Sequence, residues 1–418
     1  MKINHQGNYF NAHYFFCSRQ IANELRGVWV TTVRNNDFPS RNVFKNGFDV
    51  DQFKKEFADI LTTCRQFNLN ALFFQIRPEG DAFYPSGVNP WSQYLTGQQG
   101  VWTGVVHFDP LDWLICATHQ ASMEFHAWLN PYRLTPSTLK GKDKAALLES
   151  LSATHYARRH PDWIYFFNEQ LFIDPGVPAV TDFMVATVDE ILKNYQVDAI
   201  HLDDFFYPYP YPENDKMINF SDLAPDQGTY EKYRVDTDQT IDQWREANIN
   251  ELVYQLHKTI QRFNHANKKH VEFGISPFGI WASDKEEIGG SKTSPKQLSS
   301  LKEYVNSKLW IEAGWLDYIV PQIYWTFDDQ LSPFDVTSQW WNDVVAKTKT
   351  KLYIGLGLYL YEEDRLWTNP EEIVRQLALI RNLPHVSGFV FFTYHNLVEN
   401  KTNQPQLLKA LALLKEEV

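Results

Sequence analysis

The sequence predicts an α/β protein, a (β/α)8 TIM barrel with long βα-loop insertions at its C-terminal face. Three observations carry this prediction. Eight short apolar runs recur along the chain, amphipathic segments separate them, and most spacings between runs exceed what a minimal strand–helix unit needs. The runs are residues 28–33, 71–76, 124–129, 199–203, 271–276, 318–323, 352–356 and 388–392.

The segments between the runs have helical spacing. Phe53, Phe57 and Ile60 recur at intervals of three and four before the second run, and Trp244 and Leu252 belong to a longer pattern before the fifth. Strands that alternate with helices build a parallel sheet, and eight such units favour a closed barrel over an open sheet.

The surplus residues follow the strands, at 78–109, 130–176, 207–239 and 277–297. In a barrel these segments are the loops of the C-terminal face, where active sites are built. Residues 207–212 alternate Tyr and Pro, which excludes helix and predicts an extended wall of a cleft. One catalytic domain over residues 25–418 is the simplest organisation, with residues 1–24 as an N-terminal arm.

Composition restricts the class of partner. Apolar residues make up 44% of the 418, enough for a large core, and 39 basic against 51 acidic residues give a net charge of −12. Such a chain has no broad basic surface, which argues against nucleic acid. Aromatic residues reach 15%, and aromatic rings suit the apolar faces of sugars. We therefore expect a carbohydrate partner; the sequence does not specify an oligomeric state.

Three cysteines, at positions 17, 64 and 116, are an odd number without CxxC spacing, so neither a disulfide framework nor a zinc site is expected. Cys64 and Cys116 lie in apolar helical patterns and are predicted to be buried. No run of eighteen apolar residues predicts a transmembrane segment. Residues 1–24 lack the apolar core of a signal peptide, which by itself predicts a cytoplasmic protein.

Two adjacent acids end the fourth strand, and they are the principal functional signal. Asp203 and Asp204 follow the apolar residues 199–202, and a buried carboxylate is costly unless it is paired. Strand alternation places His201 and Asp203 inside the barrel and directs Asp204 toward the helix layer or the rim. In the alternative interpretation Asp203 merely closes the top of the barrel, and His201 is a core residue that orients a carboxylate.

Polar and aromatic residues at the other strand ends are predicted to contact substrate. Trp128 and Trp325 offer indole faces for stacking on sugars. Arg77 and Arg133 are either clamps for the ligand or counter-ions for Asp81 and Asp203. The predicted substrate-binding residues are Asn36, Arg77, Asp81, Trp128, Asn130, Arg133, His201, Gln322, Tyr324, Trp325 and Tyr394.

Motifs for other chemistries are missing. The sequence contains no HExxH, no GxSxG and no complete dinucleotide or Walker motif, so no metal and no cofactor are expected. His155 and His160 lie in an Arg-containing helical stretch and are predicted to be on the surface.

Several blocks carry a resemblance to a known family. They include RGVWVTT at 26–32, GDAFYPS at 80–86, WLNPYR at 128–133, IHLDD at 200–204, ISPFG at 275–279 and PQIYW at 321–325. Over residues 24–415 the chain resembles the bacterial glycosyl-hydrolase-like family ten. The resemblance implies a glycosidase-related barrel, with some members acting on peptidoglycan strands, and it implies an exported or cell-envelope protein, against the missing leader.

The fourth strand is also similar, more remotely, to that of chitinase-like barrels. Asp198, His201 and Asp203 match three positions of that pattern, and Phe205 stands where the catalytic glutamate would be. The proton donor must therefore be another group, Asp203 or Asp204. Glu79 is a partner by position, although the family tends to have a small residue there.

These considerations predict a glycoside hydrolase that cleaves O-glycosidic bonds, in an N-acetylated glycan such as peptidoglycan strands. Asp203 is assigned as acid/base and Asp204 as stabiliser, and the two roles can be exchanged. An N-acetyl carbonyl of the substrate is a possible nucleophile, oriented by Tyr324 and an aspartate. The alternatives are a non-catalytic carbohydrate-binding barrel and a glycosidase that acts on another bacterial polysaccharide.

Overall fold

A computed structural model describes residues 24–136, 139, 141–363, 367–398, 402 and 404–417. All of the predicted N-terminal arm except Glu24, and with it Cys17, lies outside the described residues. Glu24 accepts hydrogen bonds from the Arg381 guanidinium at 2.9 and 3.1 Å.

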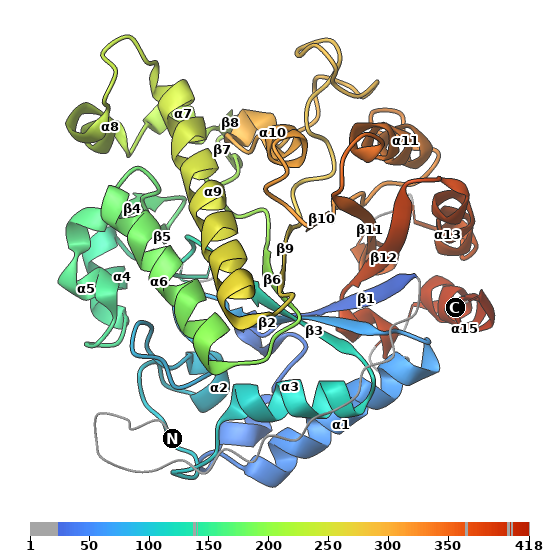
Figure 1. Cartoon of the computed structure of the whole chain (residues 1–418), viewed down its shortest axis with the longest axis horizontal. Coiled ribbons are helices and arrows are strands. Elements are labelled where there is room, and N and C mark those ends of the chain that lie inside the picture. Colours follow the sequence, from blue (N-terminus) through green and yellow to red (C-terminus); the bar gives the residue numbers. More distant parts are fainter. Residues whose placement is uncertain are drawn as a thin grey trace.

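Eight parallel strands form a closed barrel in the spatial order β1-β12-β11-β10-β9-β6-β3-β2 (Figure 1). Each predicted apolar run supplies one of them, which confirms the predicted fold. The strands are β1 (Leu25–Val30), β2 (Ala71–Arg77), β3 (Glu124–Leu129), β6 (Ala199–Leu202), β9 (Glu272–Ile275), β10 (Tyr318–Ile319), β11 (Lys351–Gly357) and β12 (Val386–Phe392).

Helices surround the barrel on its outer side (Figure 1). The long α9 lies beside α6. The larger helices are α1 (Val50–Gln66), α3 (Pro110–Gln120), α6 (Pro178–Asn194), α9 (Ile241–Asn267), α11 (Phe334–Val345), α13 (Glu372–Asn382) and α15 (Pro405–Glu417).

The first helix shows why these residues fold as they do. The Asp49 carboxylate caps α1 by accepting a hydrogen bond from the Gln52 N–H at 3.0 Å. The apolar face predicted from the sequence is buried, Phe53 and Phe57 included. Each such side chain stabilises the fold by about 1.5–3 kcal/mol when it is fully buried. Cys64 is buried on the same face, as predicted, whereas Cys116 is only half-buried, which corrects its predicted burial.

The loops after the strands carry the predicted insertions. The loop after β2 contains α2 (Gln93–Thr96), and the loop after β3 contains α4 (Lys144–Ser150), α5 (Tyr156–Arg159) and an antiparallel pair, β4 (Ile164–Phe167) and β5 (Gln170–Ile173). The segment after β6, here called the β6 insertion (residues 203–240), contains the hairpin β7 (Tyr211–Glu213) and β8 (Lys216–Ile218), followed by α7 (Phe220–Leu223) and α8 (Gln227–Tyr233).

The interior of the barrel holds a second, smaller core, and half of its buried residues are aromatic, namely Trp29, Phe73, Trp128, Tyr318 and Tyr353. A chain of hydrogen bonds runs through it. Tyr318 Oη lies 2.9 Å from Nδ1 of His126 and 3.1 Å from Nδ1 of His201. Both histidines are fully buried, so this chain joins β3, β6 and β10 inside the barrel.

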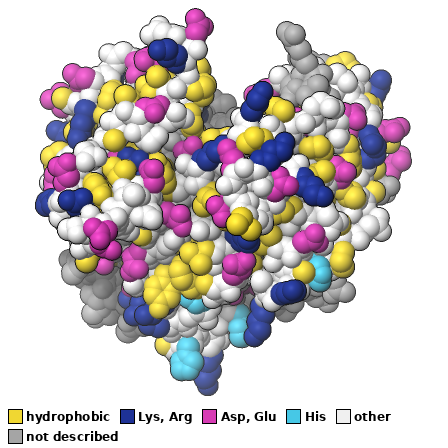
Figure 2. All heavy atoms as spheres, turned by 90° about the horizontal axis from the view of Figure 1, so that it is seen from above, with side chains coloured by type: hydrophobic (Ala, Val, Ile, Leu, Met, Phe, Trp, Pro, Cys, Tyr) yellow, Lys and Arg dark blue, Asp and Glu magenta, His cyan; other side chains and the backbone are white. Residues whose placement is uncertain are grey.

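Two further predictions concern the surface. His155 is fully buried, so its predicted surface position is wrong. It caps α5 by accepting a hydrogen bond from the Ala157 N–H at 3.1 Å. The prediction was wrong because it was based on the arginines nearby in the sequence, which are typical of a surface helix. The face in Figure 2 shows basic and acidic side chains interspersed over it rather than a basic patch. No helix among the described residues is both long and apolar enough to cross a membrane.

Candidate active site

Asp203 lies where β6 ends, at the C-terminal face, and other strands hold its carboxylate. Oδ2 accepts hydrogen bonds from Trp128 Nε1 at 3.1 Å and from Asn130 Nδ2 at 2.8 Å, both at the end of β3. Oδ1 accepts from the Phe205 N–H at 3.2 Å. These contacts confirm that Asp203 points inward. They also fix the orientation of its carboxylate.

The environment of Asp203 raises its pKa to about 7. Burial is the main cause, since the side chain is 5% exposed, and the adjacent Asp204 carboxylate adds to it. Arg133 and the hydrogen bonds from Trp128 and Asn130 act in the opposite direction. Because this pKa is close to neutral pH, the carboxyl group can both donate and accept a proton.

Asp204 is half-buried and faces different partners. The Tyr209 hydroxyl donates to its Oδ2, and the Gln322 side chain donates to the carboxylate from the segment after β10. Gln322 is itself held by the carbonyl oxygen of Ser276, at 2.9 Å from its Nε2. Burial raises the pKa of Asp204, while the donors from Tyr209 and Gln322 favour its charged form.

Half-buried aromatic residues lie near the pair. The Trp325 ring lies 5.5 Å from the ring of Phe278, which lies 6.3 Å from that of Tyr209. Tyr324 is half-buried, and its hydroxyl has no hydrogen-bond partner among the described residues. Gly279 permits this packing, because a Cβ atom there would lie 2.3 Å from the Gln322 carbonyl oxygen and 2.7 Å from Trp325. The hydroxyl of Tyr324 is itself buried, whereas aromatic rings such as these suit the apolar face of a sugar.

Arg77 and Asp81 were predicted to bind substrate, and the structure shows otherwise. Both are fully buried. The Arg77 guanidinium donates to Asn89 Oδ1, to the carbonyl oxygens of Asn130 and Pro131, and to the Tyr156 hydroxyl, over 2.6–3.2 Å. The Asp81 carboxylate accepts from the Glu79 N–H at 3.3 Å and from Gln99 Nε2 at 3.4 Å. Both side chains are out of reach of the surface, and their hydrogen bonds hold the loops that surround the site.

His201 is also a correction, because it is fully buried below the site. Trp29 Nε1 donates to its Nε2 at 3.4 Å, and Ser276 Oγ lies 3.0 Å from the same nitrogen. Since an indole N–H can only donate, Nε2 carries no proton, and Nδ1 donates to Tyr318. Burial lowers the pKa of His201 well below its ordinary value. It is a neutral core residue, and Asp203 is not among these partners.

Tyr394 is the fourth correction. It begins the short helix α14 (Tyr394–Leu397), is 5% exposed, and its side chain bonds to Thr63 of α1, on the helix layer outside the barrel. The prediction placed Tyr394 at the end of a strand, but β12 ends at Phe392 and Tyr394 begins a helix that follows Thr393.

The remaining predicted residues differ in exposure. Trp128 and Asn130 are buried and hold Asp203. Asn36 is exposed at the end of the segment after β1 and donates to Thr31 Oγ1 at 3.0 Å. Arg133 is half-buried, with its guanidinium 4.8 Å from the centre of the Phe205 ring. The structure thus brings Arg133, Gln322, Tyr324 and Trp325 together with the two acids as groups that are at least partly exposed.

Two residues near the site were not among the predicted site residues, although Glu79 was considered as a partner by position. Tyr209 is one of the alternating tyrosines of residues 207–212, which were interpreted only as a wall. Glu79 is fully buried, and the Tyr94 hydroxyl donates to its Oε2 at 2.8 Å. Burial raises the pKa of Glu79 to about 8, and Arg133 acts in the opposite direction. The signal for Glu79 was its place two residues after β2.

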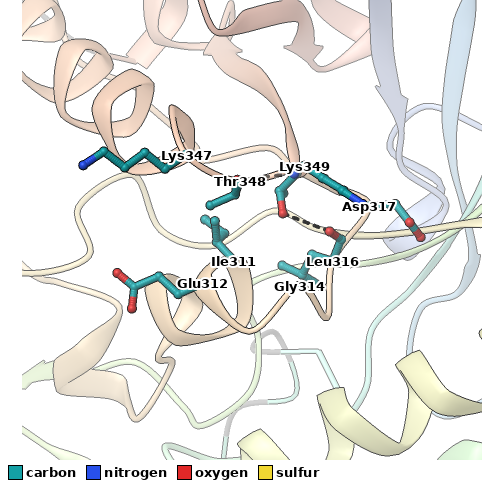
Figure 3. A pocket seen from close by; sticks show the side chains of 9 residues that line it. Ile311, Glu312, Gly314, Leu316, Asp317, Lys347, Thr348 and Lys349 are labelled. Carbon is teal, nitrogen blue, oxygen red and sulfur yellow. Dashed lines mark hydrogen bonds between the residues drawn. The ribbon is translucent and has the colours of Figure 1, made fainter.

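No group of three or more His, Cys, Asp or Glu side chains that could hold a metal ion occurs among the described residues. A pocket of about 240 Å³ lies elsewhere, and Figure 3 shows the side chains that line it. Asp317 and Thr350, which precede β10 and β11, line it together with Ile311 and Lys347. Its position at the amino ends of the strands separates it from Asp203 and Asp204.

Comparison with known proteins agrees with this geometry. A family model described as glycosyl hydrolase-like 10 matches residues 24–368. The glycosyl hydrolase YngK of Bacillus subtilis is 40% identical over 92% of this chain and 71% of its own length. The glycosyl hydrolase DigH of Escherichia coli (strain K12) is 32% identical over 95% of this chain and 88% of its own.

A solved structure shares the fold. The PgaB (BpsB) glycoside hydrolase domain from Bordetella bronchiseptica superposes with a TM-score of 0.51 at 11% identity, over 93% of this chain and 98% of that one. With a family model over most of the chain and two relatives above 30% identity, the chain is a glycoside hydrolase that belongs to the glycosyl hydrolase-like 10 family.

Proposed function

We propose that this protein cleaves O-glycosidic bonds of an N-acetylated glycan, such as the strands of peptidoglycan, with Asp203 as the acid/base. The observation that carries the proposal is the pair of carboxyl groups at the end of β6, one of them with a pKa of about 7. A group that is protonated in part of the molecules at neutral pH can protonate a leaving oxygen and then accept a proton from water.

In the first step the Asp203 proton passes to the glycosidic oxygen and the bond between that oxygen and the anomeric carbon breaks. The Asp204 carboxylate stabilises the positive charge that develops on the sugar. Tyr209 and Gln322 favour the charged form of Asp204 against the effect of burial, because both donate to it. In the second step water adds to the anomeric carbon and its proton passes to Asp203.

An N-acetyl group on the substrate supplies a nucleophile of its own. Its carbonyl oxygen would attack the anomeric carbon, which removes the need for a second enzyme carboxylate at about 5 Å. The unpartnered hydroxyl of Tyr324 supports this route, because it can donate to that carbonyl group.

The test is an assay for new reducing ends with peptidoglycan strands from which the peptides have been removed. We expect Asp203→Asn and Asp204→Asn each to lower kcat at least about 100-fold, the size usual for loss of a positioned acid or base. Asp215→Asn, an exposed aspartate of the β7–β8 turn, is the matched control. Full turnover by both active-site variants would refute the carboxylate assignment, and glycan binding by the wild type without product would refute hydrolysis of this glycan.

A further inference from the structure

Arg133 has an unusual environment for an arginine at a site that contains acids. Its side chain is half-buried, and its backbone N–H donates to Asn130 Oδ1 at 3.0 Å. Among the described residues the guanidinium makes a single hydrogen bond, from Nη2 to the Pro78 carbonyl oxygen at 3.4 Å. Its Nε atom is buried without a partner. No described carboxylate lies within the 4.0 Å of an ion pair.

The two arginines that are fully buried among the described residues, Arg77 and Arg245, have their donors in use. Arg245 donates to both carboxylate oxygens of Asp226, at 2.6 and 2.8 Å, and also to Asp242 and Tyr304. Arg77 donates to four oxygen atoms, as described above. A buried N–H donor without an acceptor, such as Nε of Arg133, is costly. Arg133 therefore differs from its counterparts in having donors to spare.

The charges around Arg133 favour an anionic ligand. Three acids lie within its electrostatic reach, namely Glu79, Asp203 and Asp204. Glu79 has a pKa of about 8 and Asp203 of about 7, both raised chiefly by burial. Near neutral pH these two groups are protonated wholly or in part, so they neutralise the guanidinium only weakly. Asp204, the third acid, interacts with Arg133 at longer range, outside the 4.0 Å of an ion pair.

The orientation of the guanidinium is fixed as well. Its central carbon lies 4.8 Å from the centre of the Phe205 ring, a cation–π contact. Phe205 also donates its N–H to Asp203, so one residue positions both the arginine and the acid. Within the described part of the chain only Nη2 of this guanidinium is engaged, by the Pro78 carbonyl oxygen, so donors remain for a carboxylate, the anion that a guanidinium binds best.

We propose that Arg133 binds a carboxylate on a sugar next to the bond that is cleaved, so that the substrate is a glycan of carboxylate-bearing sugars. This inference rests on the proposed function, because it requires a glycan in the site. Two substituents provide the same chemistry, a lactyl ether on an amino sugar and the carboxylate of a uronic acid.

Binding of disaccharides, measured by calorimetry, tests the proposal without requiring turnover. Three probes are used: a lactyl-ether disaccharide with a free carboxylate, the same molecule with that carboxylate reduced to an alcohol, and a uronic-acid disaccharide. We expect the wild type to bind at least one acidic probe about 10-fold or more tightly than the reduced probe, as a charge-assisted pair predicts. Which acidic probe binds identifies the source of the carboxylate.

Variants assign the effect to Arg133. Arg133→Gln should abolish the preference for the acidic probe. Arg133→Lys should retain part of that preference, because lysine keeps the positive charge but lacks the two parallel N–H donors of a guanidinium. Lys216→Gln, which removes an exposed charge of the β7–β8 hairpin, should leave the preference unchanged. Equal affinity of the wild type for acidic and reduced probes would overturn the proposal, as would a preference that survives in Arg133→Gln.

The outcome separates this inference from the proposed function. A preference for the acid that depends on Arg133, without release of reducing ends from any glycan, supports the carboxylate subsite and counts against hydrolysis. Hydrolysis of acidic and carboxyl-reduced glycans at equal kcat/KM supports the proposed function and overturns the subsite. Should Arg133→Gln fail to fold, the wild type and Arg133→Lys still decide the question.

Discussion

The side-chain amide of Asn130 donates to Oδ2 of Asp203 over 2.8 Å, and this bond joins the end of β3 to the end of β6. Asn130 is fully buried, and its Oδ1 accepts from the Arg133 N–H. Because both the N–H and the oxygen of this buried amide are hydrogen-bonded, Asn130 acts as a positioning residue for Asp203. It links the proposed acid to the arginine that we assign to the substrate.

The first prediction follows from this bond. Asn130→Ala removes a donor that stabilises charged Asp203, so the pKa of Asp203 should rise above its wild-type value of about 7. If Asp203 acts as the acid, the alkaline limb of the kcat/KM profile should move to higher pH. We also expect kcat to fall about 10- to 100-fold because the acid is less well held. The measurement is a pH–rate profile, with the exposed Asn382→Ala as control; an alkaline limb that stays in place would exclude this role for Asn130.

The second prediction concerns stability. The pKa of Asp203 is raised in the folded protein from 3.8 to about 7, so the folded state holds this proton more tightly than the unfolded state. Stability from this group is therefore complete below pH 3.8 and declines as the pH rises to about 7. A shift of this size corresponds to about 4 kcal/mol.

Asp203→Asn should accordingly stabilise the protein at pH 8 while it removes activity. Loss of one acceptor for the Phe205 N–H costs about 1 kcal/mol, which leaves a net gain on the order of 2–3 kcal/mol. Urea unfolding at pH 8 and pH 4 measures it, and the gain should be smaller at pH 4. Asp215→Asn should change neither value. A variant less stable than the wild type at pH 8 would contradict the cost that we assign to the buried charge.

The third prediction uses a glycine beside the site. Gly279→Ala places a methyl group 2.3 Å from the Gln322 carbonyl oxygen and 2.7 Å from Trp325, so those residues must move. We expect a loss of about 1–3 kcal/mol in stability and at least about 10-fold in kcat/KM, because Gln322 donates to Asp204. Gly228→Ala in α8 meets no atom within 4 Å and should stabilise by about 0.5–1 kcal/mol. Similar effects of the two substitutions would show that the close approach at Gly279 is unimportant.

The sequence predicted the barrel well because strand and helix periodicity is a local property. All eight runs became strands, and β3 spans the predicted residues 124–129. The inward orientation of Asp203 followed from the same alternation. The surplus after strands also mapped onto insertions, because loop length is visible in the spacing of the runs.

Prediction from strand periodicity failed where the role of a side chain depends on how deeply it is buried. Arg77 and Arg133 both follow strands and could not be distinguished from the sequence, yet one is saturated by buried oxygens and the other is half-buried with a single long bond. His201 precedes Asp203 by two residues, so its side chain points to the same side but lies deeper, inside the core. Tyr209 lies in the β6 insertion and contacts Asp204, but the path of such an insertion cannot be predicted from a local sequence pattern.

The last prediction tests how that insertion is held. Asp226, at the start of α8, and Arg245, on α9, form a fully buried ion pair, and the β6 insertion that they anchor also carries Tyr209, the donor to Asp204. Asp226→Ala leaves the Arg245 charge buried with one fewer acidic partner, which should cost about 3–5 kcal/mol. The surface pair of Lys193 and Asp189 provides the comparison, because Asp189→Ala should cost less than about 1 kcal/mol.

Urea unfolding measures both variants, and limited proteolysis reports the insertion separately. Asp226→Ala should be cleaved within residues 208–240 under conditions in which the wild type and Asp189→Ala stay intact, since the anchor of this segment is lost. Its kcat should fall as well, because displacement of Tyr209 removes a donor that keeps Asp204 charged. An Asp226→Ala variant that resists the protease and retains full kcat would show that other contacts hold the insertion and that Tyr209 is positioned without this ion pair.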